Sequence, residues 1–229
     1  PVYFLQDDHD HWENDSPLTY PVPWFQLQLA RTTQQLYYPE FLPDVTRSPG
    51  LPYSTSSARG ELSESFGTLR YGQLLEVLLY DVRRTLNVGE LNSVFLDGNV
   101  ENWLVQRTAS KDTRHLVHVP SNPPGWTAGK WGEWYPDVLH PETRQLTTQI
   151  PKPYWRQGWL NQHDRIMQSL ADMKHRNPLV IAGDLHATGV GTMHGAGNHD
   201  FSDNPITNIL CGPVSTSVRG FPSVVRGVH

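Results

Sequence analysis

Cysteine, long apolar runs and dense positive charge are all scarce in this chain, and each scarcity excludes a class of protein. The single cysteine, Cys211, cannot form an internal disulfide. Every apolar stretch is far shorter than the roughly 18 residues that a membrane-spanning helix needs, so we predict no transmembrane segment. Lysine and arginine are scattered and the net charge is -5, which gives no signature of nucleic-acid binding. Cytoplasmic and exported locations both remain open.

Several catalytic signatures are also missing. The sequence contains no G-x-S-x-G nucleophile motif, and Cys211 has no obvious activating neighbours. The segment "GTMHGAGNHD" is rich in glycine but lacks the G-K-[ST] ending of a phosphate-binding loop. Hydrolysis through a serine or cysteine nucleophile is therefore poorly supported.

Histidine, tryptophan and proline are plentiful instead. The 229 residues include 11 histidines, 8 tryptophans and 19 prolines, and the length suffices for one large domain or two small ones. Histidine is the commonest metal ligand, so its abundance favours metal or acid–base chemistry. The alternative is that most of these histidines lie in loops and on the surface.

The order of elements predicts a layered α/β or α+β fold. Strands alternate with helices, and the central strands are apolar throughout. We expect helices at 22–37, 97–109 and 158–175, and strands at 1–6, 66–71, 73–82, 114–120, 178–183, 206–210 and 214–220. Asp97 is a candidate N-cap for the second helix, and four apolar residues could partly bury the first, namely Phe25, Leu27, Leu29 and Leu36. Residues 121–158 are rich in tryptophan and lack periodicity, as is typical of a functional loop.

The chain begins at Pro1 inside what reads as a strand, without a recognisable leader. We therefore expect it to be a piece of a longer protein that starts within a domain. The sequence leaves localisation and oligomeric state open.

Two clusters of candidate ligands follow apolar strands. "DDHDHWEND" (7–15) crowds carboxylates and imidazoles that would repel or stay solvated unless cations compensate them. "IAGDLHATG" (181–189) places Asp184 and His186 two residues apart after a short apolar strand. In an extended chain their side chains would leave on the same side, and together they suit a metal ion. The alternatives are a solvated acidic loop and an aspartate that caps the next turn.

Five segments in this order resemble motifs of the PhoD-like alkaline phosphatases, members of the metallophosphoesterase superfamily. They are "QDDHDHWEND", "GTLRYGQLLEVLLYDVRR", "LDGNVENWL", "YWRQGWLNQHDRIMQSL" and "VIAGDLH". The resemblance implies a sandwich of two packed sheets flanked by helices, incomplete at its N-terminus. Residues 1–229 would form the C-terminal part of a single PhoD-like metallophosphatase domain.

The resemblance also implies roles for individual residues. Asp8 would bind metal in place of an asparagine of the wider superfamily, and His9 would contact the substrate phosphate and protonate the leaving oxygen. Asp184 and His186 would each bind one ion of a metal pair. The bridging aspartate of the family lies upstream of the matching motifs.

Three further residues match the family at supporting positions. Asn14 falls on the asparagine that follows the D-D-H-E motif, and Asp81 with Arg83 fits an L-D-x-R element that supports the site without binding metal.

The sequence departs from the family at two places. Pro153 stands where an aspartate commonly precedes the W-x-G-Y motif. "HVP" at 118–120 resembles the H-x-P that supplies a histidine ligand in other metallophosphoesterases, so His118 is a candidate replacement ligand. The alternative is a buried strand histidine that hydrogen-bonds to a backbone carbonyl.

The resemblance predicts metal-dependent hydrolysis of phosphate mono- or diesters. Two ions would share a hydroxide and hold the phosphate in line, and iron, calcium, manganese or zinc would suit the ligand types. The alternatives are a non-catalytic relative that binds a phosphorylated ligand or partner, and a structural α/β domain with fortuitous acidic loops.

Overall fold

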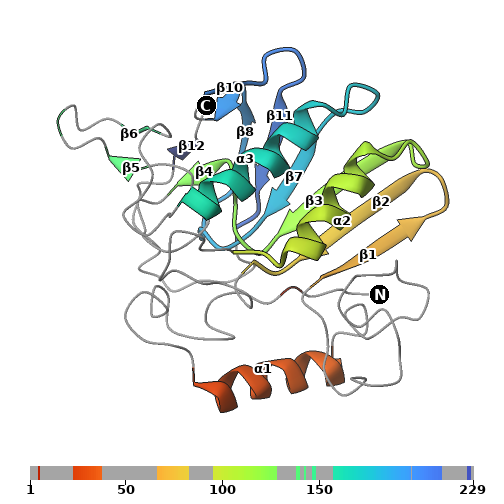
Figure 1. Cartoon of the computed structure of the whole chain (residues 1–229), viewed down its shortest axis with the longest axis vertical. Coiled ribbons are helices and arrows are strands. Elements are labelled where there is room, and N and C mark those ends of the chain that lie inside the picture. The colour runs from red at the N-terminus through yellow and green to blue at the C-terminus, as the bar shows by residue number, and fades with distance from the viewer. Residues whose placement is uncertain are drawn as a thin grey trace.

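A single mixed sheet organises the computed structural model of this chain (Figure 1). The structure describes residues 5, 23–37, 66–82, 95–127, 138–139, 142, 146–147, 157–196, 198–212 and 226–227. The account of the fold below concerns these residues.

The sheet has six strands in the order β1-β2-β3-β7-β11-β8. Their bounds are β1 Phe66–Tyr71, β2 Leu75–Tyr80, β3 His115–Pro120, β7 Leu179–Ala182, β8 Gly189–Met193 and β11 Ile206–Leu210. The four central strands, β2, β3, β7 and β11, run parallel, and β1 and β8 pair antiparallel at the two edges. The carboxyl ends of the four parallel strands therefore meet at one edge of the sheet.

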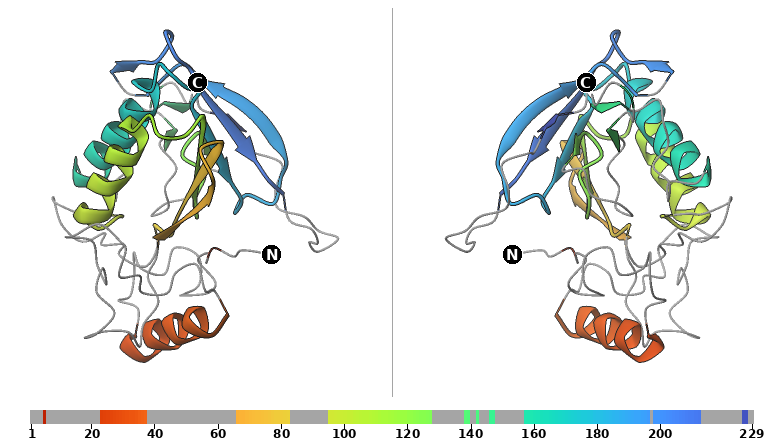
Figure 2. Two further views of the ribbon diagram at one scale, coloured as in Figure 1. Left: turned by 90° about the vertical axis from the view of Figure 1, so that its right-hand side faces the viewer. Right: turned by 90° about the vertical axis from the view of Figure 1, so that its left-hand side faces the viewer.

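Two helices, α2 (Gly98–Ala109) and α3 (Gln157–Ala171), cover one face of this sheet (Figure 2). Asp97 caps α2 as predicted, because its Oδ1 accepts a hydrogen bond of 2.8 Å from the backbone N–H of Asn99. The core between helices and sheet includes Trp103, Leu104, Leu170 and Tyr80. The helices thus lie in the connections between parallel strands, and the face of the sheet that they cover is apolar.

Short strands form three further two-stranded sheets. Their pairs are β4 (Trp126–Thr127) with β12 (Arg226–Gly227), β5 (Val138–Leu139) with β6 (Leu146–Thr147), and β9 (Gly195–Ala196) with β10 (His199–Asp200). Of the two packed sheets that the family resemblance implies, the described residues contain one with more than two strands.

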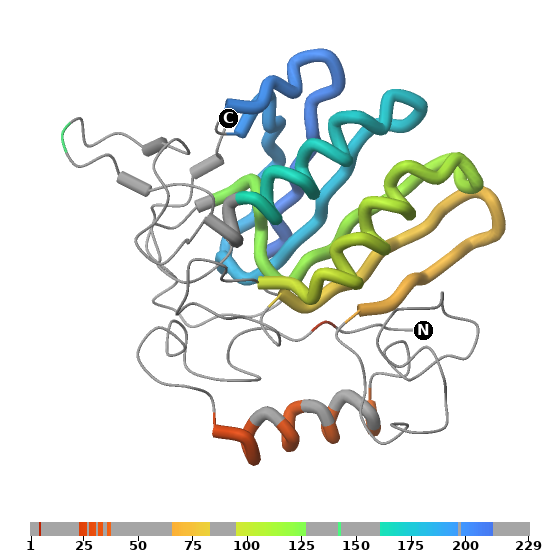
Figure 3. Tube along the Cα trace, viewed as in Figure 1, coloured from red at the N-terminus to blue at the C-terminus, as the bar shows by residue number. Residues whose placement is uncertain are grey.

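Helix α1 (Trp24–Tyr37) lies apart from the sheet (Figure 3). The prediction that its apolar residues partly bury is wrong for three of them: Phe25, Leu29 and Leu36 are 69%, 65% and 69% exposed. The side chain of Leu27 lies outside the described part. Among the described residues, we find no helix that is both long and apolar enough to cross a membrane.

The predicted α/β class is confirmed, with local corrections. The third helix ends at Ala171 rather than at residue 175, because residues 172–176 form turns closed by hydrogen bonds such as Arg176 N–H to Met173 O. Strands β8 and β9 were not predicted, since they contain glycines that interrupt an apolar pattern, and β10 has only the two polar residues His199 and Asp200. The predicted strands at 1–6 and 214–220 lie outside the described residues, apart from Leu5.

Candidate functional site at the carboxyl edge of the sheet

Strand register aligns four polar residues at the carboxyl edge. Tyr80 of β2 pairs with Pro120 of β3, so Asp81 and Ser121 follow side by side. His118 of β3 pairs with Val180 of β7, and four residues further along each strand come Asn122 and Asp184. The ends of three parallel strands therefore bring Asp81, Ser121, Asn122 and Asp184 into one row, where folds of this class bind ligands.

Side-chain hydrogen bonds join these residues in two pairs. The Ser121 hydroxyl donates to Oδ1 of Asp81 at 3.5 Å, and its Oγ accepts from the backbone N–H of Val82 at 3.0 Å. The Asn122 Nδ2 donates to Oδ2 of Asp184 at 3.4 Å. Asp81, Ser121 and Asn122 are buried, whereas Asp184 is half-buried. The second pair therefore forms the part of the row that solvent can reach.

The backbone after β7 is not extended, contrary to the geometry expected from the sequence. Asp184 and His186 have φ values of +70° and +33°, in the left-handed region that residues other than glycine rarely adopt. Asparagine and aspartate tolerate this region better than most residues, and each such residue costs about 1–3 kcal/mol. Backbone strain of this kind concentrates at functional sites, so the tight turn supports a role for Asp184 and His186.

Leu185 anchors the turn from inside. It is 1% exposed and forms a small cluster with Leu210, against which Trp126 and Ala187 pack. The indole of Trp126 lies so close to Gly189 that an added Cβ there would meet Cζ2 at 3.3 Å and Cη2 at 2.7 Å. The beginning of the tryptophan-rich segment therefore packs beside the turn that carries Asp184 and His186.

His118 lies in the core rather than at the carboxyl edge. Its Nδ1 is 3.1 Å from the Tyr80 hydroxyl and its Nε2 is 3.0 Å from Oγ1 of Thr108. The Thr108 hydroxyl donates to the carbonyl of Leu104, so it must accept from Nε2–H, and Tyr80 must then donate to Nδ1. Burial, followed by the charge of Arg176, lowers the pKa of His118 to about 3.

This network favours a structural role for His118 over a ligand role. The lone pair of Nδ1 that a metal would need already accepts a hydrogen bond from Tyr80, and burial raises the pKa of that phenol, which keeps it a donor. The predicted partner, a backbone carbonyl, is replaced by two hydroxyl groups.

Several predicted site residues lie outside the described part of the chain. They are Asp8, His9, Asn14 and Arg83. The prediction that the 7–15 loop meets the turn holding His186 therefore stays a prediction. Among the residues that the structure does describe, no group of three or more histidine, cysteine, aspartate or glutamate side chains is placed to hold a metal ion.

The described donors nevertheless fit a hard or borderline cation. Asp184 offers carboxylate oxygen and His186 offers imidazole nitrogen, two of the ligand types that iron, manganese and zinc accept. Asn122 contacts the Asp184 carboxylate through a neutral amide, which brings no positive charge to it. Asn122 was missed in the sequence because it opens a segment taken as an irregular loop; its place directly after a parallel strand was the available signal.

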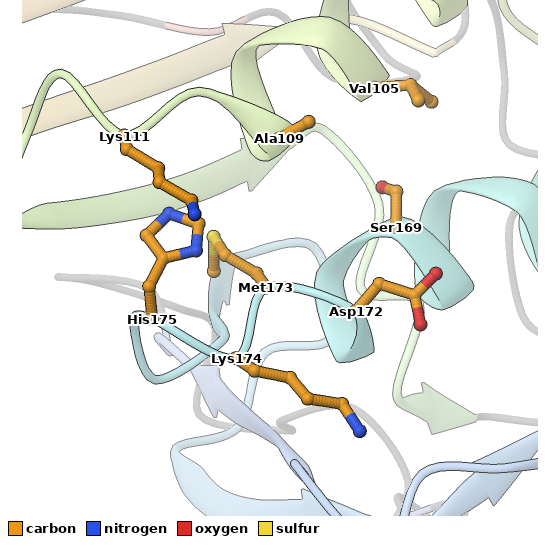
Figure 4. A pocket seen from close by; sticks show the side chains of 8 residues that line it. All are labelled: Val105, Ala109, Lys111, Ser169, Asp172, Met173, Lys174 and His175. Carbon is orange, nitrogen blue, oxygen red and sulfur yellow. The ribbon is translucent and has the colours of Figure 1, made fainter.

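A pocket of about 590 Å³ lies elsewhere, between the C-terminal ends of α2 and α3 (Figure 4). Lys111, Asp172, Met173 and His175 are among its lining residues. The ends of both helices face the amino edge of the parallel strands, so this pocket is not part of the row at the carboxyl edge.

Comparisons with known proteins support the fold. No family model matches this sequence, and no curated protein matches it. A solved structure, that of PhoD, superposes with a TM-score of 0.55 at 16% sequence identity. The match covers 92% of this chain and 39% of the PhoD chain, so the chain spans well under half the length of that protein. The chain therefore has a fold similar to that of PhoD.

Proposed function

We propose that this protein is a metal-dependent phosphoric ester hydrolase, similar to alkaline phosphatase D, that cleaves phosphate mono- or diesters. One observation carries the proposal. In a chain folded like PhoD, the motif "VIAGDLH" ends at the carboxyl edge of the sheet in a strained turn, with Asp184 hydrogen-bonded to Asn122.

The proposed ligands are Asp8, Asp184 and His186, which would hold two divalent or trivalent ions chosen from iron, calcium, manganese and zinc. Such a pair would supply a hydroxide nucleophile near neutral pH and would offset the charge of the phosphate. His118 is left out of this set because both of its ring nitrogens have partners in the core.

The proposal also assigns roles in proton transfer, in supplying negative charge and in excluding water. His9 would contact the phosphate and give a proton to the leaving oxygen, as a general acid placed within hydrogen-bond reach. Asp184 supplies negative charge that its neutral neighbour Asn122 does not cancel. Trp126, Leu185 and Leu210 exclude water from the inner side of the turn, which strengthens electrostatic interactions there.

The test is phosphate release by the purified full-length protein. We expect turnover of p-nitrophenyl phosphate, bis(p-nitrophenyl) phosphate or both, abolished by a chelator and restored by one of the four metals. Asp184→Ala should abolish turnover, while the matched control Asp172→Ala, at an exposed position by the other pocket, should retain it. Full activity of Asp184→Ala would refute the proposal.

A second function, favoured by Pro153 at a position where the family commonly has aspartate, is non-catalytic binding of a phosphorylated ligand or partner. Metal analysis separates the two. An enzyme should purify with, or take up, stoichiometric metal, whereas a non-catalytic relative should bind inorganic phosphate without metal and without turnover.

A further inference from the structure

Asn122 is a buried amide at the one place where β3 and β7 end together. It is 1% exposed, and its Nδ2 donates to Oδ2 of Asp184 at 3.4 Å. Burying an amide costs free energy unless its groups find partners. The hydrogen bond to Asp184 offsets part of this cost, and Asp184 is the carboxylate of the candidate site that solvent can reach.

The backbone around Asn122 is held from both sides. Ser121 N–H donates to the carbonyl of Tyr80 at 3.0 Å, which fixes the preceding residue to the end of β2. On the other side Gly125 packs so closely on Asn208 that an added Cβ would lie 2.5 Å from Cγ of that side chain. Residues 121–125 are all buried. Asn122 is consequently presented to Asp184 by a rigid support.

The Asp184 turn needs such a support. At φ +70° its backbone sits in a sparsely populated region, which persists only when surrounding contacts hold it. A charged donor such as lysine would fix the carboxylate but also offset its charge and weaken cation binding. An amide fixes the carboxylate and keeps the charge, as outer partners of metal ligands commonly do.

We propose that Asn122 is a positioning residue that orients the Asp184 carboxylate for a metal ion. The inference rests on the proposed function, since it assumes that Asp184 binds a cation. In this role Asn122 acts through its Nδ2 donor and does not itself bind the metal.

The experiment is calorimetric titration of the metal-free full-length protein with Mn²⁺. We expect Asn122→Ala to weaken binding by about 10- to 100-fold, the usual effect of removing a partner of a metal ligand. Asn204→Ala is the matched control, because Asn204 also donates through Nδ2, at 3.0 Å to the carbonyl of Ala171, but precedes β11 at the opposite edge. Its affinity for Mn²⁺ should equal that of the wild type.

A second variant, Asn122→Asp, separates donation from ligation. Aspartate keeps the shape but cannot donate at neutral pH, so the positioning role predicts weakened binding. Affinity equal to or tighter than the wild type would overturn the proposal, because it would mark position 122 as a ligand. The thermal melting midpoints of the metal-free Asn122→Ala and Asn204→Ala proteins should fall by similar amounts. Equal losses of stability with unequal metal affinities would show that the loss of affinity does not come from unfolding.

The outcomes distinguish this inference from the function on which it rests. Wild-type binding of Mn²⁺ with unchanged affinity in Asn122→Ala overturns the positioning role and leaves the phosphatase proposal standing. No binding of Mn²⁺ or of the other three metals by the wild type overturns both.

Discussion

The two edges of the parallel strands differ in the side chains that contact their carboxylates. At the amino edge, Glu76 is 2% exposed and bonded to Arg107, whose guanidinium also holds Asp112 at 2.9 Å. At the carboxyl edge, Asp81 accepts from the Ser121 hydroxyl and Asp184 from the Asn122 amide. In these contacts, the amino edge pairs negative with positive charge, whereas Ser121 and Asn122 at the carboxyl edge are neutral donors.

At the amino edge, an arginine side chain also donates hydrogen bonds to carbonyl groups at the C-terminal end of α2. Arg176 is 6% exposed and donates to the carbonyl of Thr108 in the last turn of α2 at 2.9 Å and to that of the C-cap Ser110 at 2.6 Å. A cation at this position offsets the partial negative charge of the helix C-terminus. Burial opposes ionisation of Asp112, but hydrogen bonds from Ser110 and Arg107 outweigh it and lower the pKa of Asp112.

The difference distinguishes charges that stabilise the fold from charges that a ligand would use. A charge network that neutralises itself stabilises the fold and has little left to offer a ligand. The amide that contacts Asp184 in its strained turn, by contrast, adds no positive charge of its own. We therefore expect substitutions at the two edges to separate stability from binding.

The largest expected effect is on the binding side. Asp184→Asn keeps the shape of the side chain and tolerates the left-handed turn, but removes the charge. We expect metal affinity and phosphate release to fall by at least about 100-fold, since metal catalysis supplies several kcal/mol. The melting temperature should change little. A protein that loses its melting transition instead would show that Asp184 serves the fold.

The converse substitution, Glu76→Gln, should act on stability. It leaves Arg107 without its buried partner, although Asp112 still contacts that guanidinium. Removing one member of a buried pair costs about 3 kcal/mol, which urea denaturation of the wild type and the variant would measure. Metal affinity below the unfolding transition should match the wild type. A loss of affinity without a loss of stability would contradict the contrast between the edges.

A smaller effect comes from buried histidines and depends on pH. The pKa of His118 is lowered from 6.5 to about 3 by burial and by Arg176. Above pH 6.5 both the folded and the unfolded chain carry it neutral. Below pH 6.5 the unfolded chain takes up a proton that the folded chain refuses, so stability falls by about 1.4 kcal/mol per pH unit down to pH 3. His163, with a pKa also lowered to about 3 by burial and by His199, adds a similar slope.

His118→Gln tests this contribution. Between pH 6.5 and 5.0, we expect the variant to lose about 2 kcal/mol less of its unfolding free energy than the wild type does. His115→Gln, at an exposed position on the same strand, is the matched control substitution. The metal content of His118→Ala completes the test, because a reduced occupancy would restore the ligand role that the hydrogen-bond network disfavours.

Sequence patterns predicted those elements whose burial or capping depends on residues within the element itself. The apolar runs of β2 and β7 and the Asp97 cap of α2 were readable because burial and capping leave periodic or positional marks. Strand β8, with the sequence GVGTM, was not, because its pairing with β11 sets its conformation and its glycines carry no pattern. Phe25 of α1 was expected to be partly buried, although only tertiary contacts decide its exposure.

Some features of the candidate site were likewise predictable from the sequence and others were not. Asp184 was found from its place after an apolar strand, but its turn was expected to be extended, and the left-handed residues were not foreseeable from composition. Asn122 became visible only through the pairing of His118 with Val180, which is a property of the sheet register. Long-range register places partners that a single strand cannot reveal.

The smallest expected effect concerns the backbone of the Asp184 turn. His186 has φ +33°, so His186→Gly should relieve strain and raise the unfolding free energy by about 1 kcal/mol while it weakens metal binding. Gly72 provides the opposite control in the turn between β1 and β2. It has φ +54° and an added Cβ would meet nothing within 4 Å, so Gly72→Ala should cost about 1 kcal/mol through the backbone alone and leave metal binding unchanged. If His186→Gly destabilised the protein as much as Gly72→Ala, the imidazole would be holding the turn together, and the carboxyl edge would resemble the amino edge in stabilising itself.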